Sequence, residues 1–480
     1  MISFKTYTKS MLLVFCALFA MSLTSCKDQP NEYEVQDGTP KVNYIRALST
    51  EIKGNNDAEG THYTKGELVE EASPQTVLCL VGENLRSVVD IWFNDRQCVL
   101  NTSYITDNTL IVSVPKNVPE TVTDKIYLYN NKKEVVEVPF HVVIPAPQVT
   151  TMGCEYDKPG TETKVIGQYL VDNAEKPLQI FFKDESGNNI PATIKNVSPD
   201  YTYATVIIPE NAREGAITAT SMYGTGVSGF HYQESRGLLF DFDGGGVPVE
   251  ISDNKVNHGW HGTRCFNDDK SLDGYYIQLG GDGAEMSADG KWDDSNFTFE
   301  HWCGSWDDPQ NFTSGSGMAL TNLVDFSKPE NLTLKFEMMV PKDSPWKAGA
   351  MQIIFAGKDY VTLSGNGGLK AANNIFFRCP GLDGGDWEKD DYFKDKKPLS
   401  RALYRPWKDT GSFDTGGKWI TVSIPITTSF VYSFDGSALP FNLKPESFSS
   451  LTLFIVGGGV NGEDCTPVIC IDNIRVVPSK

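Results

Sequence analysis

The feature that most constrains the fold of this chain is an alternation of apolar and polar residues with a period of two. Residues 109–115 read Thr-Leu-Ile-Val-Ser-Val-Pro and residues 125–129 read Lys-Ile-Tyr-Leu-Tyr, and similar runs recur along the chain. Because successive side chains of a strand point to opposite faces of a sheet, this period indicates strands with one buried face. Helical periodicity is nearly absent, so the pattern predicts an all-β protein.

The strand pattern occurs twice in the first half of the chain. The tetrapeptide Gly82-Glu83-Asn84-Leu85 lies between two predicted strands, and its counterpart is Gly167-Gln168-Tyr169-Leu170. The second copy departs from the first at Gln168, where asparagine would be usual. Pro145-Ala146-Pro147 is a stiff boundary between the copies. We therefore expect two small β-sandwiches, at 41–145 and 146–235, after a polar tether at 26–40.

The first copy carries a resemblance to a known fold. The stretches TVLCLVGENLRSVVDIWFNDRQCVL and DNTLIVSVPKNV resemble the IPT/TIG immunoglobulin-like fold, with its G-x-N-L turn and F-N-D hairpin. The resemblance implies an immunoglobulin-like sandwich for each copy. Neither copy contains a cluster of titratable residues that could perform chemistry. We favour a rigid spacer over a ligand-binding immunoglobulin domain, because a fold alone proves no activity.

The composition changes after residue 236, where longer strand patterns alternate with long polar loops. Apolar runs at 238–242 and 467–477 open and close this region. The pattern predicts a larger jelly-roll-like β-sandwich at 237–480, in which the terminal strands lie close together. Loops longer than about fifteen residues usually carry function.

Eight of the nine tryptophans follow Leu238, most of them in polar stretches rich in glycine and aspartate. Flat rings in such surroundings suit ligands with an apolar face and hydroxylated edges, and sugars are the obvious class. We expect about half of these rings to be structural, because tryptophan is highly buried on average. Trp419 is assigned to the core because it starts an alternating strand. The candidate glycan-binding rings are Trp302, Trp306, Trp346, Trp387 and Trp407.

No catalytic pattern accompanies these tryptophans in the sequence. A retaining glycosidase needs two carboxylates about 5 Å apart, as an E-x-D-x-x-E run on one strand would place them, and no such run occurs. His258 and His261 lack a third ligand nearby, so a surface pair is favoured over a metal site. Neither a nucleophile elbow nor a phosphate-binding glycine loop occurs. The sequence therefore predicts no catalytic residues.

A structural calcium ion is the one cofactor that the sequence leaves open. Asp241, Asp243 and Asp472 come together if the first and last strands of the third region pair, and carboxylates of this kind hold Ca²⁺ in many proteins. An ordinary turn and a cross-strand contact are the favoured explanation, so we expect no cofactor. The cysteines after Cys26 show no metal-binding spacing. Disulfides and buried free thiols are both open to them in an exported protein.

Residues 1–25 have the features of a lipoprotein signal peptide. Two lysines precede an apolar run at 11–21 that is too short to span a bilayer as a mature helix. Leu23-Thr24-Ser25-Cys26 then has the form of a lipobox, so Cys26 is the predicted lipidation site, with a plain secretory signal as the alternative. The net charge of −20 argues against nucleic acid and favours a neutral ligand. We expect a surface-exposed outer-membrane lipoprotein that touches the membrane only through its lipid.

The whole arrangement resembles surface glycan-binding protein B of bacterial polysaccharide-utilisation loci. Within the third region, SGSGMALTNLVDFSKPENLTLKFEMMVPKDSPWKAG, LYRPWKDTGSFDTGGKWITVSIPI and ICIDNIRVVP are similar to the family's xyloglucan-binding domain. The resemblance implies binding of a neutral plant polysaccharide, xyloglucan or a related β-glucan, without cleavage. It also implies an outer-membrane glycan transporter as partner, and Trp346 with Trp302 or Trp306 as platform rings. A jelly-roll lyase or hydrolase, and an adhesin that binds protein, are the alternatives.

Overall fold

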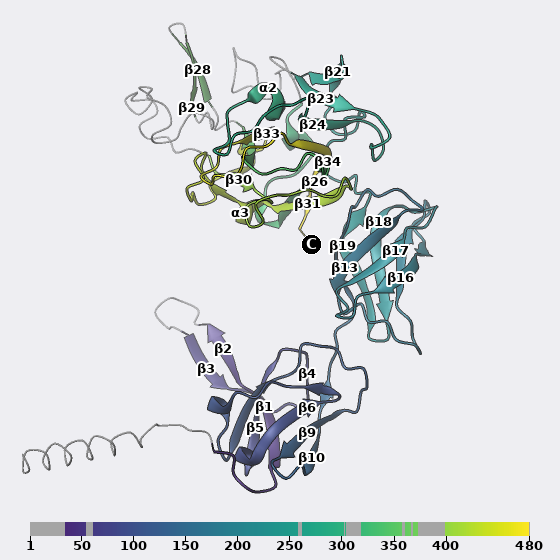
Figure 1. Ribbon diagram of the computed structural model, residues 1–480, viewed down its shortest axis with the longest axis vertical. Coiled ribbons are helices and arrows are strands. Elements are labelled where there is room, and N and C mark those ends of the chain that lie inside the picture. Colours follow the sequence, from purple (N-terminus) through teal and green to yellow (C-terminus); the bar gives the residue numbers. More distant parts are fainter. Residues whose placement is uncertain are drawn as a thin grey trace, which may run out of the picture. The chain divides into compact units, whose positions relative to one another are not determined.

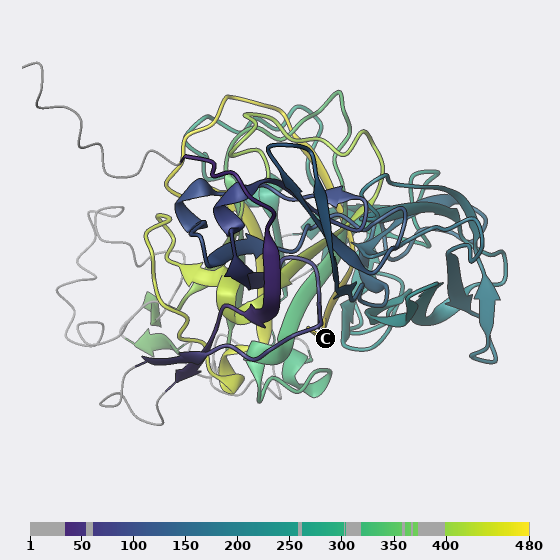
Figure 2. The same ribbon diagram turned by 90° about the horizontal axis from the view of Figure 1, so that it is seen from below.

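We describe the protein from a computed structural model (Figures 1 and 2). The structure describes residues 34–53, 61–257, 262–301, 303, 318–357, 361–365, 368–372 and 399–479. These residues are organised almost entirely in β-sheets, which confirms the all-β prediction. The chain divides between Pro145 and Ala146 into two compact units. No helix among the described residues has the length and apolarity needed to cross a membrane.

The first unit is a small β-sandwich. One sheet has the order β1 (Lys41–Ala47), β5 (Val77–Glu83), β8 (Thr109–Ser113), and the other has the order β10 (Val135–Pro139), β9 (Lys125–Asn130), β6 (Val88–Phe93), β7 (Arg96–Gln97). Two smaller pairs are β2 (Ser49–Lys53) with β3 (Thr61–Lys65), and β4 (Glu71–Ala72) with β11 (His141–Val142). Burial alternates along β9 as the sequence predicts, with Ile126 and Leu128 fully buried.

The second unit begins with another small sandwich. Its two sheets have the orders β12 (Gln148–Met152), β13 (Glu162–Gln168), β17 (Tyr203–Ile207), β16 (Thr193–Val197), and β15 (Asn189–Pro191), β14 (Gln179–Lys183), β18 (Arg213–Ser221), β19 (Gly224–Tyr232). The buried side chains of both sheets form one core that includes Val165, Phe182 and Val206.

The repeated tetrapeptide has the same geometry in both sandwiches. Gly82 pairs with Val42 and Gly167 pairs with Val149, and a β-bulge follows each of these partners. A Cβ on either glycine would come within 1.8 Å of a backbone oxygen of the facing strand, so only glycine fits. Asn84 has a φ of 56°, as does Tyr169. The equivalent of Asn84 is therefore Tyr169 and not Gln168, which corrects the sequence comparison.

The rest of the second unit is a larger sandwich of two sheets. The eight-stranded sheet has the order β21 (Glu250–Ser252), β22 (Lys255–Asn257), β23 (Gly262–Phe266), β24 (Tyr276–Gly280), β34 (Val468–Pro478), β26 (Leu332–Met339), β31 (Ile420–Pro425), with β20 (Leu238–Phe240) also paired to β34. The five-stranded sheet has the order β25 (Thr298–His301), β33 (Ser450–Val456), β27 (Ala350–Ala356), β30 (Arg401–Tyr404), β32 (Phe430–Tyr432). The first and last strands pair as expected, so teal and yellow ribbons adjoin in Figure 1.

Three short elements complete the larger sandwich. Helix α2 (Asp294–Phe297) precedes β25, and helix α3 (Ile426–Ser429) lies between β31 and β32. β28 (Val361–Gly365) and β29 (Gly368–Ala372) form a hairpin. Between the two large sheets lies an extensive apolar core, which contains residues of both, such as Phe240, Phe336 and Leu453.

A buried ion cluster joins the small and large sandwiches of the second unit. Arg475 in β34 donates to Glu155 of the small sandwich and to Glu337 in β26, at 2.6 Å in each case. Lys335 in β26 lies 2.5 Å from the other oxygen of Glu155, and the Glu155 amide donates to the Thr421 hydroxyl. Glu155, Glu337 and Arg475 are fully buried. Removal of one member leaves the others buried without full compensation, so the cluster holds the two sandwiches together.

The seven described cysteines are free thiols, and six of them are buried. Of disulfides and buried free thiols, which the sequence leaves open, the described cysteines are free thiols, and all but Cys465 are buried. Cys26 and the histidine pair His258 and His261 lie outside the described residues.

Candidate functional site

The five-stranded sheet has one apolar face and one mixed face. On β33, Leu451, Leu453 and Ile455 share one face of the strand, so the intervening side chains lie on the opposite face, where they are buried as well. Those side chains are Ser450, Thr452 and Phe454. The register places Gln352 of β27 opposite Phe454, and Arg401 of β30 follows on the same face. This outer face combines hydroxyl, amide, guanidinium and aromatic groups, but each of these side chains is at most 6% exposed, so the face is covered and its polar groups serve contacts within the protein.

A buried hydrogen-bond network makes the floor of the outer face rigid. Arg401 Nη1 donates to Gln352 Oε1 at 2.6 Å, and Gln352 Nε2 donates to the carbonyl oxygens of Phe434 and Gly457 at 2.9 Å. The Arg401 guanidinium also lies 5.5 Å from the centroid of the Phe434 ring. Because Gln352 and Arg401 are at most 1% exposed, these contacts replace the water that both groups lose.

Trp292 is the most exposed tryptophan that the structure describes, with 42% of its surface accessible. It lies two residues before α2, and its ring meets Phe454 edge to face at 4.8 Å between centroids. A second contact, at 6.3 Å, is with Phe434. Trp292 thus presents an aromatic surface beside the outer face. The prediction from sequence did not select it, although its neighbours Lys291, Asp293 and Asp294 are as polar as those of the selected rings.

The structure contradicts the predicted platform role of Trp346. Its ring is 0% exposed, belongs to the apolar core, and donates from Nε1 to the Ala348 carbonyl at 2.7 Å. The backbone of Trp346 also pairs with that of Phe413. A completely buried ring has no face on which a sugar can stack, so Trp346 is a structural residue.

The structure also contradicts the predicted glycan-binding role of Trp407. It is 2% exposed, belongs to the same core, and donates from Nε1 to the Gly349 carbonyl at 2.8 Å. Trp419, predicted to lie in the core, is only partly buried and packs edge to face against Tyr276 at 5.5 Å. It lies just before β31, close to Cys154 of the small sandwich.

The other three predicted rings, Trp302, Trp306 and Trp387, lie outside the described residues. The strands that precede these tryptophans are described, so the pairing register shows where the two connections that contain them leave the sheet. β25 ends at His301 opposite Leu451, and β27 ends at Ala356 opposite Ser450. Both connections therefore leave the same end of the five-stranded sheet, since these two partners are neighbours at the start of β33.

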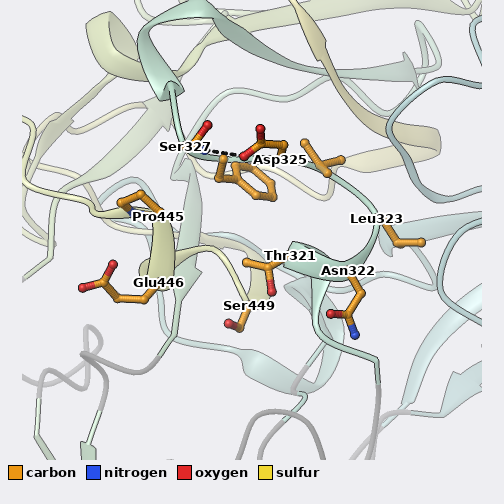
Figure 3. Close-up of a pocket in the computed structure, with 10 residues that line it drawn as sticks. Thr321, Asn322, Leu323, Asp325, Ser327, Pro445, Glu446 and Ser449 are labelled. Atoms are coloured by element: carbon orange, nitrogen blue, oxygen red, sulfur yellow. Dashed lines mark hydrogen bonds between the residues drawn. The ribbon is translucent and has the colours of Figure 1, made fainter.

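A pocket of about 560 Å³ lies beside that end of the sheet (Figure 3). The Leu320 amide donates to the Ser449 carbonyl, which anchors one wall to the residue just before β33. Asp325 accepts from the Ser327 amide at 2.9 Å, as Figure 3 shows. Phe326 stacks on Phe448 at 4.4 Å and gives the pocket an apolar base. The lining residues are Thr321, Asn322, Leu323, Val324, Asp325, Phe326, Ser327, Pro445, Glu446 and Ser449.

One group in the small sandwich of the second unit has the composition of a metal site. Glu214, His231 and Glu234 bring one ligand atom each within 4.8 Å of the others. Glu234 is already paired with Arg236, and Ser235 donates to Glu214 at 2.6 Å. These carboxylates are therefore satisfied by the protein itself, and the pairing with Arg236 disfavours a second cation.

The fold defines a modular β-sandwich protein, in which immunoglobulin-like modules precede a larger β-sandwich. Residues 232–478 match the family model described as the surface glycan-binding protein B xyloglucan binding domain, and residues 61–145 match the TIG domain model. The chain belongs to the surface glycan-binding protein B family. Membership confirms the predicted family, the predicted fold class, and the prediction of a binding protein and not an enzyme.

Two relatives show how far the similarity extends. A surface glycan-binding protein from Prevotella bryantii is 38% identical and covers 92% of this chain and 100% of its own, with a TM-score of 0.64. An IPT/TIG domain-containing protein from Bacteroides ovatus is 24% identical over 228 residues, which is 45% of this chain. That match spans 42% of the length of the Bacteroides protein.

Proposed function

We propose that this protein is a cell-surface lipoprotein that binds a neutral plant polysaccharide, xyloglucan or a related β-glucan, without cleaving it. The observation that carries the proposal is the exposed ring of Trp292, which packs edge to face on Phe454 of the five-stranded sheet within the part of the chain that the family model matches. The family description, which names a xyloglucan binding domain over residues 232–478, supports the ligand class.

The aromatic platform is proposed to comprise Trp292 together with Trp302, Trp306 and Trp387. The two connections that carry the last three rings begin at the same end of the sheet, beside the pocket of Figure 3. Stacking of an indole on the C–H face of a pyranose supplies affinity. Exposed polar groups of the pocket, such as Thr321, Asn322 and Glu446, then distinguish one sugar orientation from another.

The test is affinity electrophoresis and isothermal titration with xyloglucan, mixed-linkage β-glucan and an anionic polysaccharide. We expect binding to a neutral β-glucan and none to the anionic polymer, because the net charge of −20 repels it. Trp292→Ala and Trp387→Ala each weaken binding by about tenfold or more, which corresponds to about 1.4 kcal/mol. Trp92→Ala, in the first sandwich, is the matched control and leaves affinity unchanged. Full affinity in the Trp292 and Trp387 variants would remove the platform from the proposal.

Cys26 is proposed as the lipid attachment site that anchors the protein to the outer membrane, with a glycan transporter in that membrane as partner. The lipobox Leu23-Thr24-Ser25-Cys26 supports the anchor. Cys26→Ala releases the protein from membranes in this scheme, whereas protease treatment of intact cells degrades the parent. Retention of Cys26→Ala in the membrane fraction would contradict the anchor. Failure to co-purify with any outer-membrane transporter from detergent extracts would contradict the partner.

A further inference from the structure

The outer face of the four-stranded sheet in the first sandwich carries a group of aromatic side chains. Trp92 lies in β6, and Tyr127 and Tyr129 lie in β9, each alternating with buried residues of its strand. The register places Trp92 opposite Tyr127, and β6, β9 and β10 lie side by side in Figure 1. Neighbouring strands are about 5 Å apart and alternate residues of a strand about 7 Å apart, so the rings form a compact array. All three rings are partly exposed.

The ring of Trp92 is held in place by polar neighbours. Its Nε1 donates to Asp90 Oδ2 at 2.8 Å, and Gln97 Nε2 donates to Asp90 Oδ1 at 2.8 Å. The Ile91 amide also donates to Oδ1, at 2.9 Å. The carboxylate is therefore satisfied within the protein. The indole is oriented before a ligand arrives, which lowers the entropic cost of binding.

The hydroxyl groups of Tyr127 and Tyr129 have no hydrogen-bond partner among the described residues. By contrast, the hydroxyls of Tyr156 and Tyr232 in the second unit each donate to a backbone carbonyl, at 2.5 and 2.7 Å. A phenol that makes no contact within the protein is available to a ligand as both donor and acceptor. The face therefore offers polar contacts beside the apolar surfaces of its rings.

The charged groups at the edge of the face are paired with each other. Glu137 lies opposite Tyr127 on β10, and its Oε2 is 2.5 Å from Lys125 Nζ. The two charges cancel, so they exert no net attraction on a charged ligand. Exposed Val135, opposite Tyr129, extends the apolar surface instead. Oriented rings, available hydroxyls and cancelled charges together suit a neutral carbohydrate.

We propose that Trp92, Tyr127 and Tyr129 form a second carbohydrate-binding face, and that its ligand is the surface of an insoluble neutral β-glucan. A sheet face is broad, and rings from neighbouring strands meet the sugar rings of several adjacent chains of a solid at once. A single dissolved chain meets fewer rings and is held only weakly. For this reason Trp92→Ala leaves the affinity for soluble glucan unchanged, as the control in the titrations requires.

This face goes beyond the platform proposed in the large sandwich and does not rest on it. On a solid, both surfaces of one chain find sugar at a high local concentration, so their joint occupancy raises retention without any new contact. The sequence predicts a spacer for the first sandwich, and the face adds a binding role to that module.

The test is adsorption of the purified protein to microcrystalline cellulose, measured as the partition coefficient between solid and solution. Trp92→Ala and Tyr127→Thr each lower this coefficient at least threefold. Threonine keeps the strand preference at position 127, and calorimetry checks that the transition of the first unit is retained. Tyr104→Ala is the matched control and adsorbs like the parent, because Tyr104 is 55% exposed in η2 (Thr102–Tyr104), outside both sheets.

The same series is measured in a Trp292→Ala/Trp387→Ala background, which separates this face from the proposed platform. There the protein still adsorbs to cellulose, and adding Trp92→Ala removes the remaining adsorption. Failure of the platform is seen separately, as full affinity of this background for soluble glucan.

Three outcomes would overturn the proposal. One is the absence of cellulose adsorption by the parent protein. Another is unaltered adsorption of both Trp92→Ala and Tyr127→Thr. The third is an equal loss of adsorption to polystyrene beads in these variants, which would show that the face is merely an apolar surface.

Discussion

Replacing Trp346 by alanine tests whether this ring is structural. Its ring is fully buried, contacts Tyr404 at 6.1 Å between centroids, and donates a hydrogen bond to Ala348. Replacement of a buried Trp by alanine costs about 3–5 kcal/mol. For a domain of this size, each kcal/mol lowers the Tm by about 2–4 °C. We therefore expect the transition of the large sandwich to fall by roughly 6–20 °C.

The assay is differential scanning calorimetry of Trp346→Ala beside Trp292→Ala. The first unit ends at Pro145, so its transition serves as an internal reference that neither substitution changes. Trp292→Ala removes a ring that is 42% exposed, and its Tm stays within about 2 °C of the parent. A Trp346→Ala protein that melts like the parent and has lost its glycan affinity would refute the reasoning, because it would make this ring a surface platform.

Three further outcomes follow from ionisable and thiol groups elsewhere in the chain. Glu155→Ala leaves Arg475 with one carboxylate fewer, so calorimetry shows a loss of about 3–5 kcal/mol, and an unchanged Tm contradicts the role of the cluster. Burial raises the pKa of Asp157 to about 6, so its stabilising contribution is complete below about pH 4 and lost as the pH rises through about 6. Asp157→Asn therefore flattens the dependence of Tm on pH between 4 and 7, and an unaltered slope contradicts the shift. Thiol-labelling with peptide mapping modifies Cys465 first among the described cysteines, because the others are buried, and simultaneous labelling of all of them contradicts this order.

Much of the fold was predictable because the strands carry their own signal. Alternation along β9, the repeated Gly82 and Gly167 turns, and the apolar first and last runs of the large sandwich are local patterns, and the structure has a strand or turn at each. Local patterns suffice here because each strand needs only one buried face.

The tryptophans were not predictable in the same way. Trp346 and Trp407 have polar neighbours in sequence, yet long-range contacts turn both rings inward: Trp346 pairs with Phe413, and Trp407 donates to Gly349. The path of the loop decides the direction of the ring, and the identity of the next residue does not. Trp292 has equally polar neighbours and points outward beside Phe454. A local pattern could not separate the three.

The ion cluster around Arg475 also has a mechanical consequence. Under the proposed function, tension on a bound polysaccharide loads the large sandwich, in which β34 pairs with β20, β24 and β26. From there Arg475 transmits it directly to Glu155 of the small sandwich, through charge-assisted hydrogen bonds shielded from water. The short connection between the two sandwiches therefore does not carry the load alone. The two bodies should respond to tension as one stiff element, and separating them should require rupture of a desolvated salt bridge.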